Sequence, residues 1–390
     1  MTTSPAKRPE AEPETESAVA TAASDHRHRG YPAFICALTA GVAVVSLPFI
    51  ARHVDGSADE FSIRTAPVLP ALGWLVCAAL AAVVVTHRLQ IWFNFDEGSV
   101  LAVAYDALPL LLFSAPLIAI AAAISGHLLL AGAAVLLTVY EAVLVVPRLR
   151  SRPVPEWTRT APQIRVAVAN VYVDNETPGD AARQLVGSDA DVIVIAEATP
   201  EFMHIFRSVG GDAAYPHIVS DPDDTSDYAI AIASRLPLEA GSALRIIGPL
   251  RLAVAEVEVG GIRTTIAALN PRSTFDTEGQ EVWKAQMEQL KSYVPTVQGP
   301  LVVAGDLNTT GFRPQFDELL QVGLVDAIDS LGQAWKPSFS LKSVWPLGAL
   351  GVVARLDQAL VNDRAASLSI RNLHTCGSDH VPFVITVVVR

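Results

Sequence analysis

Hydrophobic residues follow two different patterns along the chain. The first part holds four long apolar runs with almost no charged residues, at residues 31–51, 68–86, 101–124 and 128–146. Each run is close to the ~20 residues that a helix needs to cross the hydrocarbon core of a bilayer. The pattern therefore predicts about four transmembrane helices. Only Ser125, Gly126 and His127 separate the last two runs, which predicts a tight helical hairpin.

A second pattern begins near residue 164, where short runs rich in β-branched residues alternate with helical patterns. We predict strands at residues 164–169, 192–196, 229–233, 252–259, 264–269, 301–304, 356–361 and 382–389. We predict helices at residues 180–186, 199–209, 278–293 and 312–321. Strands in this number, with helices between them, favour an α/β sandwich that contains two packed β-sheets.

These patterns divide the chain into four segments. Residues 1–30 are rich in Ala, Glu, Thr, Pro and Ser and have no hydrophobic period, which is typical of a disordered tail. Residues 31–147 form the predicted transmembrane region. Residues 148–163 contain three prolines and several charges, so we predict a linker. Residues 164–390 form the predicted C-terminal domain.

Composition and charge agree with this division and narrow the choice of partners. Hydrophobic residues make up 51% of the chain and charged residues only 17%, whereas soluble proteins carry about 25% charged residues. A lipid bilayer is therefore an expected partner. The formal net charge is −12, and the part after the membrane region is acidic. This charge disfavours a long nucleic acid as the substrate, because such ligands are bound by Lys and Arg clusters. A phosphorylated substrate stays compatible with this charge, since a bound divalent metal inverts the local field.

Arginines at the ends of the membrane region bear on its orientation. Arg27 and Arg29 precede the first apolar run, and Arg148, Arg150 and Arg152 follow the last one. The positive-inside rule therefore places both ends, and with them the C-terminal domain, in the cytoplasm. This result requires that all four runs cross the membrane.

Two carboxylates, Asp106 and Glu141, lie within or beside the apolar runs. Carboxylates inside a membrane are functional candidates by default. Both lie near the predicted edges of their runs, where a charge can reach the aqueous interface. We therefore expect an ordinary interfacial role for both, and we do not expect a transport path.

Polar residues gather at the ends of the predicted strands of the C-terminal domain. They are Asn170, Glu197, Asp306, Asn308, Asp357, Asp379 and His380. One such residue after a strand is ordinary turn chemistry. Five strand ends that together supply carboxylates, amides and a histidine indicate a shared site. Hard oxygen ligands of this kind suit Mg²⁺ or Mn²⁺.

The order of these residues resembles the endonuclease/exonuclease/phosphatase superfamily. An Asn, a Glu, Asp-x-Asn in GDLN, Arg-x-Asp in RLDQ and Ser-Asp-His in GSDH follow one another over residues 165–390. The resemblance implies a four-layer sandwich in which helices flank the two packed sheets. It also implies a hydrolase of phosphoric esters that depends on a divalent metal.

The resemblance also implies a role for each residue. Glu197 and Asn170 would help to hold the divalent cation, Mg²⁺ or Mn²⁺, with Asp379 near that site. Metal stabilisation of the charge that develops on the phosphate, combined with an in-line water, is the chemistry expected of such a site.

The remaining residues would act on the water and the phosphate. Asp306 would orient or deprotonate the attacking water, and Asn308 would position the water and the phosphate. His380 would contact the phosphate, oriented by Asp357. A carboxylate beside an imidazole favours its protonated form, so we expect His380 to be charged.

One position departs from the family pattern. Many members carry a histidine after the strand that here reads TTIAALNP, where this chain has Asn270. Asparagine can donate a hydrogen bond, but it cannot supply a proton near neutral pH. Arg272 is a candidate to bind phosphate in its place. A catalytically weakened scaffold or sensor with the same fold is therefore an alternative function.

A closer resemblance is to bacterial membrane proteins of the VanJ type, which carry N-terminal spans before such a domain. The matching text is NPRSTFDTEGQEVWKAQMEQL, GDLNTT, VGLVDA and GSDH. It implies a lipid-linked or envelope-associated phosphate or pyrophosphate as the substrate, and an extracytoplasmic domain. An extracytoplasmic domain conflicts with the arginine pattern, which places the domain in the cytoplasm. Both sides of the membrane therefore remain alternatives. A membrane-bound nuclease is a further alternative, which the acidic charge disfavours. No feature of the pattern indicates an oligomeric state.

Overall fold

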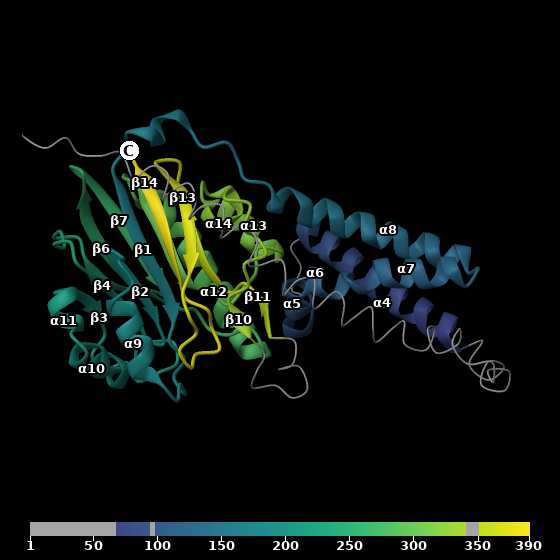
Figure 1. Cartoon of the computed structure of the whole chain (residues 1–390), viewed down its shortest axis with the longest axis horizontal. Coiled ribbons are helices and arrows are strands. Elements are labelled where there is room, and N and C mark those ends of the chain that lie inside the picture. Colours follow the sequence, from purple (N-terminus) through teal and green to yellow (C-terminus); the bar gives the residue numbers. More distant parts are fainter. Residues whose placement is uncertain (1–67, 94–97, 341–350) are drawn as a thin grey trace, which may run out of the picture. The chain divides into compact units, whose positions relative to one another are not determined.

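The computed structural model describes residues 68–93, 98–340 and 351–390, all within one compact unit that spans Ser57–Arg390. The predicted tail at 1–30 and the predicted span at 31–51 lie outside the described residues. Figure 1 shows the helices and strands with the labels used below.

The apolar runs form helices. They are α4 (Val68–Phe93), α5 (Gly98–Asp106), α6 (Leu108–Leu112), α7 (Ser114–Ile124) and α8 (Leu128–Val145). Among the described residues, two helices are long and apolar enough to cross a membrane, at Val68–Phe93 and Leu128–Leu149. The bent helix pair Val100–Asp106 and Leu108–Ile124 gives a third candidate span if the two helices are counted together as one span. The predicted hairpin is confirmed, because α7 packs against α8 across the short turn at Gly126.

The third apolar run departs from the single straight helix that its composition predicts. Its two parts meet at an angle of 73° at Ala107. Pro109 stands at the start of α6, and a proline ring clashes with the carbonyl four residues earlier, which here belongs to Tyr105. The break leaves Asp106 at the C-terminal end of α5, where its largely buried carboxylate can bind groups outside the helix.

Strands of the C-terminal domain form two packed sheets, and the described residues give each of them six strands. The order in the first sheet is β13 (Ala365–Asn372), β14 (Phe383–Val389), β1 (Gln163–Asn170), β2 (Val192–Ala196), β4 (Ile230–Ser234), β3 (His217–Ser220). The order in the second is β5 (Ala243–Ile247), β6 (Leu250–Val259), β7 (Ile262–Leu269), β8 (Leu301–Asp306), β12 (Asp357–Val361), β9 (Val325–Asp326). A short ladder joins β10 (Phe339–Ser340) to β11 (Val352–Ala354).

Helices cover the outer face of each sheet (Figure 1). The first sheet carries α9 (Pro178–Val186) and α10 (Pro200–Ser208), with α11 (Gly211–Ala214) beside α10. The second carries α12 (Thr277–Tyr293) and α13 (Pro314–Gln321). The one-turn helix α14 (Ala327–Ser330) and the short 3₁₀ helices Val146–Leu149, Glu156–Arg159 and Val294–Thr296 complete the elements found in the described part. The predicted sandwich of two packed sheets flanked by helices is therefore confirmed, and both sheets are mixed.

Every predicted strand and helix of this domain is present, with small differences at the ends. The pattern missed β3, β5, β9 and β13, which lie at the edges of the two sheets, and the short strands β10 and β11. An edge strand is partly exposed and needs fewer apolar residues. All positions of β5 and most positions of β13 are exposed or half-buried. A search for apolar runs therefore does not detect these two strands.

Alternation along the central strands decides which side chains face the other sheet. In β1, Val166 and Val168 lie in the core between the sheets, whereas Ala167 and Ala169 face the helices. Since side chains alternate between the two faces of a strand, Asn170 continues the inner face. In β8, the same alternation from Val302 and Ala304 places Asp306 on the inner face of the facing sheet. Two polar side chains therefore point toward each other between the sheets.

Candidate functional site

The strand ends that carry the predicted site residues meet at one end of the sandwich. β1 runs parallel to β2, and Asn170 pairs with Ala196, the residue before Glu197. In the facing sheet, Asp306 at the end of β8 pairs with Asp357 at the start of β12. His380 lies three residues before the start of β14, the strand that pairs with β1. The sheet register thus brings residues more than two hundred positions apart in the chain to one place.

Two similar turns follow the ends of β1 and β8. The backbone N–H of Tyr172 donates to Asn170 Oδ1 at 2.9 Å, and that of Asn308 donates to Asp306 Oδ1 at 2.9 Å. Tyr172 and Asn308 both adopt a left-handed backbone, with φ of 60° and 50°. Glu197 also has a positive φ, 58°. Such conformations cost about 1–3 kcal/mol for residues other than glycine and gather at functional sites.

Gly305 allows the β8 end to lie close to β7. Its φ is 144°, and a Cβ at this position would stand 2.0 Å from the carbonyl oxygen of Leu269. Any other residue would push the two strands apart at the point where Asp306 begins the turn. The glycine of the GDLN motif is therefore required by the close approach of two backbones.

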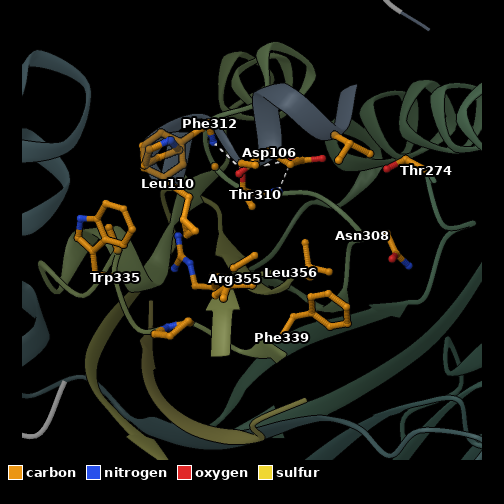
Figure 2. A pocket seen from close by; sticks show the side chains of 18 of the residues that line it. Asp106, Leu110, Thr274, Asn308, Thr310, Phe312, Trp335, Phe339, Arg355 and Leu356 are labelled. Atoms are coloured by element: carbon orange, nitrogen blue, oxygen red, sulfur yellow. Dashed lines mark hydrogen bonds between the residues drawn. The ribbon is translucent and has the colours of Figure 1, made fainter. Parts of the chain in front are cut away.

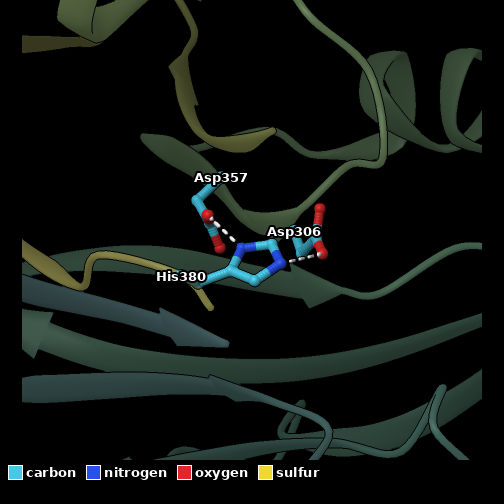
Figure 3. A group of neighbouring side chains, drawn as sticks. All are labelled: Asp306, Asp357 and His380. Carbon is cyan, nitrogen blue, oxygen red and sulfur yellow. Dashed lines mark hydrogen bonds and ion pairs between the residues drawn. The ribbon is translucent and has the colours of Figure 1, made fainter. Parts of the chain in front are cut away.

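His380 lies between two aspartates, as Figure 3 shows. Its Nδ1 is 2.6 Å from Asp357 Oδ2, and its Nε2 is 3.7 Å from Asp306 Oδ2. The structure thus places Asp357 against His380, the contact that the resemblance implies. All three side chains are buried, so water screens their charges only weakly.

The charges of this group determine its protonation. Burial alone would lower the pKa of His380, but the carboxylates of Asp357 and Asp306 outweigh it and raise that pKa to about 10. Burial raises the pKa of Asp306 to about 6, although the charge of His380 opposes this rise. Near neutral pH the group therefore holds a charged imidazolium between two carboxylates.

Asn170 connects this group to Glu197. Its Nδ2 donates to Glu197 Oε1 at 2.8 Å and to Asp306 Oδ2 at 3.0 Å. The second oxygen of Glu197 accepts from the backbone N–H of Val173 at 2.6 Å. Burial raises the pKa of Glu197 to about 7. Two carboxylates from opposite sheets are therefore drawn toward one amide in a buried space.

The residues of this space fit a divalent cation on the side of Glu197. The Asp306, Asp357 and His380 atoms lie within 4.8 Å of one another, but a protonated imidazolium has no lone pair with which to bind a metal. The carboxylate of Glu197 is a hard oxygen ligand, and a cation beside it would offset the burial that raises its pKa. Asn170 would have to rotate its amide to present its oxygen, which now accepts from Tyr172.

The other predicted residues lie around this group at different distances. Asp379 Oδ1 is 4.0 Å from His380 Nε2. Asn308 donates from Nδ2 to the carbonyl of Pro271 at 3.0 Å, and so joins the GDLN turn to the segment after β7. Asn270 donates to the carbonyl of Asp227 at 2.9 Å, and Arg272 stacks on the ring of Tyr228 at 4.9 Å. Asn270 and Arg272 are therefore engaged with the 227–228 loop.

Three supporting residues were not predicted. Ser378 Oγ accepts from the N–H of His380 and donates to the carbonyl of Asn170. Ser338 Oγ accepts from the N–H groups of Leu356 and Asp357, and the ring of Phe339 packs on His380 at 5.1 Å. Ser378 stands inside GSDH and could have been included with that motif. Ser338 and Phe339 carry no local signal, because only the fold brings their segment to the site.

The sequence motifs RLDQ and VGLVDA contact each other through ion pairs. Arg355 of RLDQ forms ion pairs with Asp326 of VGLVDA at 2.8 Å and with Asp329 at 2.9 Å. Arg355 and Asp326 are buried. This pairing fixes the start of β12, from which Asp357 projects two residues later.

Asp106 has a different role from the interfacial one expected above. Its carboxylate accepts from the backbone N–H of Thr310 at 2.7 Å and from the Thr309 hydroxyl at 3.1 Å, and it pairs with Arg313 at 3.4 Å. His87 of α4 also contacts the carbonyl of Phe312 at 2.9 Å. The apolar helices thus hold the segment 309–313, which directly follows Asn308. The sequence did not reveal this link, because Asp106 and Thr310 are 204 positions apart.

Comparisons with known proteins agree with this arrangement. Residues 167–380, more than half of the chain, match the model of the Endonuclease/Exonuclease/phosphatase family. A search of curated proteins finds no match.

Several solved structures are similar. TDP2 of D. rerio complexed with single strand DNA product has a TM-score of 0.48 and 17% identity, over 58% of this chain and 98% of that one. Sphingomyelinase C from Streptomyces griseocarneus has 0.44 and 16%, over 58% and 99%. A beta toxin mutant from Staphylococcus aureus with bound magnesium ions has 0.42 and 13%, over 58% and 100%.

The raised pKa of Glu197 predicts that cation binding depends on pH. A cation bound by Glu197 must displace its proton. Below pH 7, where Glu197 becomes protonated, we expect Mn²⁺ affinity to fall about tenfold per pH unit. Calorimetry in two buffers of different ionisation enthalpy measures both the affinity and the protons released. Affinity that stays constant from pH 5.5 to 7.5 would contradict this site, and Glu197→Gln should weaken binding and reduce proton release.

Proposed function

The chain belongs to the endonuclease/exonuclease/phosphatase family, and from that premise we propose that it is a membrane-anchored phosphoester or pyrophosphate hydrolase that depends on Mg²⁺ or Mn²⁺. Members of the family, among them phosphodiesterases, nucleases and sphingomyelinases, are metal-dependent hydrolases. The proposed substrate is a lipid-linked or envelope-associated phosphate, as in VanJ-type membrane proteins. The lipid bilayer is the proposed partner.

One observation carries the hydrolase proposal. Asn170, Glu197, Asp306 and His380 come from four separate strand ends, yet contacts of 2.8 to 3.7 Å join them, and all but the half-buried Glu197 are buried. A structural core has no need for several ionisable groups there, since burying charges is costly unless they are paired. Perturbed pKa values at such a place are typical of catalytic sites.

The chain's own residues support hydrolysis by a positioned water. Asp306 is the base that orients the water, and its carboxylate is held by Asn170 and by the backbone of Asn308. His380, charged and held by Asp357, donates a hydrogen bond to a phosphate oxygen through Nε2. Asn308 directs its amide to the same space. A cation held by Glu197, with Asn170 and Asp379 nearby, would stabilise the negative charge that develops on the phosphate.

The apolar helices support the membrane part of the proposal. Two of them meet the length and hydropathy required for a span, and many of their large apolar side chains are exposed, including Leu75, Leu129 and Leu136. Exposed apolar surface on this scale marks a contact with lipid or with another protein. A substrate confined to the same bilayer would meet the site without diffusing through water.

Asn270 supports one alternative, a scaffold or sensor that has lost turnover. Its amide is used by the carbonyl of Asp227, and an amide cannot protonate a leaving group. A substrate with a good leaving group, such as a pyrophosphate, needs little acid assistance and is therefore the better fit to this chain. A nuclease is disfavoured by the net charge of −12.

A substrate panel tests the proposal. The purified full chain in detergent is expected to hydrolyse a prenyl pyrophosphate with Mg²⁺ or Mn²⁺, to lose this activity with EDTA and to regain it when metal is added back. Phospholipids with different head groups and single-stranded and duplex DNA serve as competing substrates. Preferred cleavage of DNA would replace the lipid substrate with a nuclease function. No turnover of any phosphoester would favour the scaffold.

The side of the membrane that carries the domain stays a prediction with two alternatives. A pair of reporters fused after Arg390, one active only in the cytoplasm and one only outside it, distinguishes them. Cytoplasmic activity agrees with the arginine pattern, and extracytoplasmic activity agrees with a substrate of the cell envelope.

A further inference from the structure

An apolar cavity of about 160 Å³ lies between the apolar helices and the candidate active site (Figure 2). On the helix side, its walls are formed by Val103, Ala107, Pro109 and Leu110 around the break between α5 and α6. On the other side, they are formed mainly by Phe312, Trp335, Phe339, Val353, Ala354 and Leu356. Nothing in the reaction proposed above uses this space.

The cavity shares walls with the catalytic group. Asn308 lines it and also belongs to the turn that holds Asp306. Phe339 lines it, and the same ring packs on His380. Leu356 lines it directly before Asp357. A molecule whose phosphate lies at His380 can therefore extend its other end into the cavity past Asn308 and Phe339.

The charged residues that line the cavity already have partners within the protein. Asp106 binds Thr310 and Arg313, Arg355 binds Asp326 and Asp329, and Arg148 binds Asp329 at 3.2 Å. A polar or anionic occupant would have to compete with these internal partners. An occupant without charge leaves all of them intact, so the wall favours hydrocarbon.

The size of the cavity limits what it can hold. Apolar cavities of about 150 Å³ bind small molecules such as benzene, so this one accommodates about six carbon atoms. It does not hold a whole lipid tail, and the rest of a longer chain would leave along the helices. The break at Ala107 lies within a candidate span, which gives such a chain an apolar path.

We propose that this cavity binds the phosphate-proximal segment of the hydrocarbon chain of an amphiphilic phosphoester. The inference rests on the proposed function, which it deepens by giving the substrate a chain-binding subsite. The cavity then selects substrates whose phosphate carries an alkyl or prenyl chain over those with a polar group at the same position. It also aligns the phosphate with His380 and Asp306.

Two synthetic substrates with the same leaving group test this proposal, p-nitrophenyl methyl phosphate and p-nitrophenyl dodecyl phosphate. Each buried methylene contributes about fourfold in binding, part of which is lost in ordering the chain. We expect the full chain, with Mn²⁺ in detergent, to show a kcat/KM about 10- to 100-fold higher for the dodecyl ester. Part of that advantage reflects enrichment in the micelle, so the decisive comparison is between variants.

Ala107→Phe and Ala354→Phe fill the cavity from opposite walls. Either should lower kcat/KM for the dodecyl ester about tenfold or more and leave the methyl ester nearly unchanged. Ala123→Phe is the matched control, because Ala123 is exposed on α7 and lies outside the cavity lining. A dodecyl-to-methyl ratio that equals the wild-type ratio in both cavity variants would overturn the proposal.

Binding without turnover separates this inference from the proposed function. Trp335 lines the cavity, so dodecyl phosphate brominated near its head group should quench its fluorescence, seen as the difference between the wild type and Trp335→Phe. Quenching that Ala107→Phe abolishes supports the subsite even if no ester is hydrolysed. Equal quenching in wild type and Ala107→Phe overturns the subsite even if hydrolysis proceeds normally.

Discussion

Asp306→Asn is expected to lower kcat for the phosphoester substrate by about 10³-fold while the domain stays folded. A positioned general base contributes about 10²- to 10⁴-fold to a rate, and Asp306 is the carboxylate that lies between Asn170 and His380. The amide oxygen of the variant can still accept from the backbone of Asn308, so the turn at the end of β8 persists. Steady-state kinetics with saturating Mn²⁺ measures the loss.

The pH profile adds a second readout for the same variant. His380 must be protonated to donate to the phosphate, so activity is lost as pH rises through its pKa of about 10. The charge of Asp306 is one cause of that raised pKa, and its removal should shift the alkaline limb of any residual activity to lower pH. Asp363→Asn removes an exposed carboxylate and serves as the control with unchanged kinetics. Retention of more than a tenth of the activity by Asp306→Asn would contradict the assigned role.

Asp106→Ala is expected to destabilise the protein by about 3 kcal/mol, because it leaves the guanidinium of Arg313 without its carboxylate partner. Arg313 is fully buried, stacks on Trp283 at 4.1 Å and also binds Gln280. Breaking a buried ion pair by removing one partner costs about 3–5 kcal/mol. The thermal midpoint of the purified protein in detergent measures this loss.

Asp106→Ala should also reduce turnover, since Asp106 holds the segment that follows Asn308. A displacement of about 1 Å at a catalytic group can cost about 100-fold in rate, and we expect kcat to fall by about 10- to 100-fold. Asp106→Asn keeps an oxygen that can accept from Thr310 and should restore part of the activity. If Asp106→Ala lowers the thermal midpoint but leaves kcat unchanged at a temperature where it is folded, Asp106 is structural only.

The strand ends were predictable because the rules involved are local. Alternation along RVAVAN and LVVAGD determines that Asn170 and Asp306 face the same way as the inner valines. The glycine before Asp306 and the polar residues after each strand are visible as short motifs. Their order identified the family, and the family match over residues 167–380 confirms it.

The links between distant segments were not predictable in this way. The bend at Ala107 follows from Pro109, but the sequence does not say that Asp106 then meets Thr310. Ser338 and Phe339 belong to a segment with no motif, and only the register of β10 and the turn before β14 brings them to Asp357 and His380. The edge strand β13 was missed because its exposed positions break the apolar pattern.

The sequence by itself therefore determined the apolar helices, the central strands and the chemical types of the site residues. These properties depend on hydrophobic periodicity and on short-range turn chemistry, both of which act within about ten residues. The tertiary structure alone decided that His380 lies between two carboxylates, that Asp106 holds the segment after the GDLN turn, and that a cavity adjoins both. Those features arise from the packing of segments far apart in the chain, where the pairing of sheets and the bend of one helix set the distances.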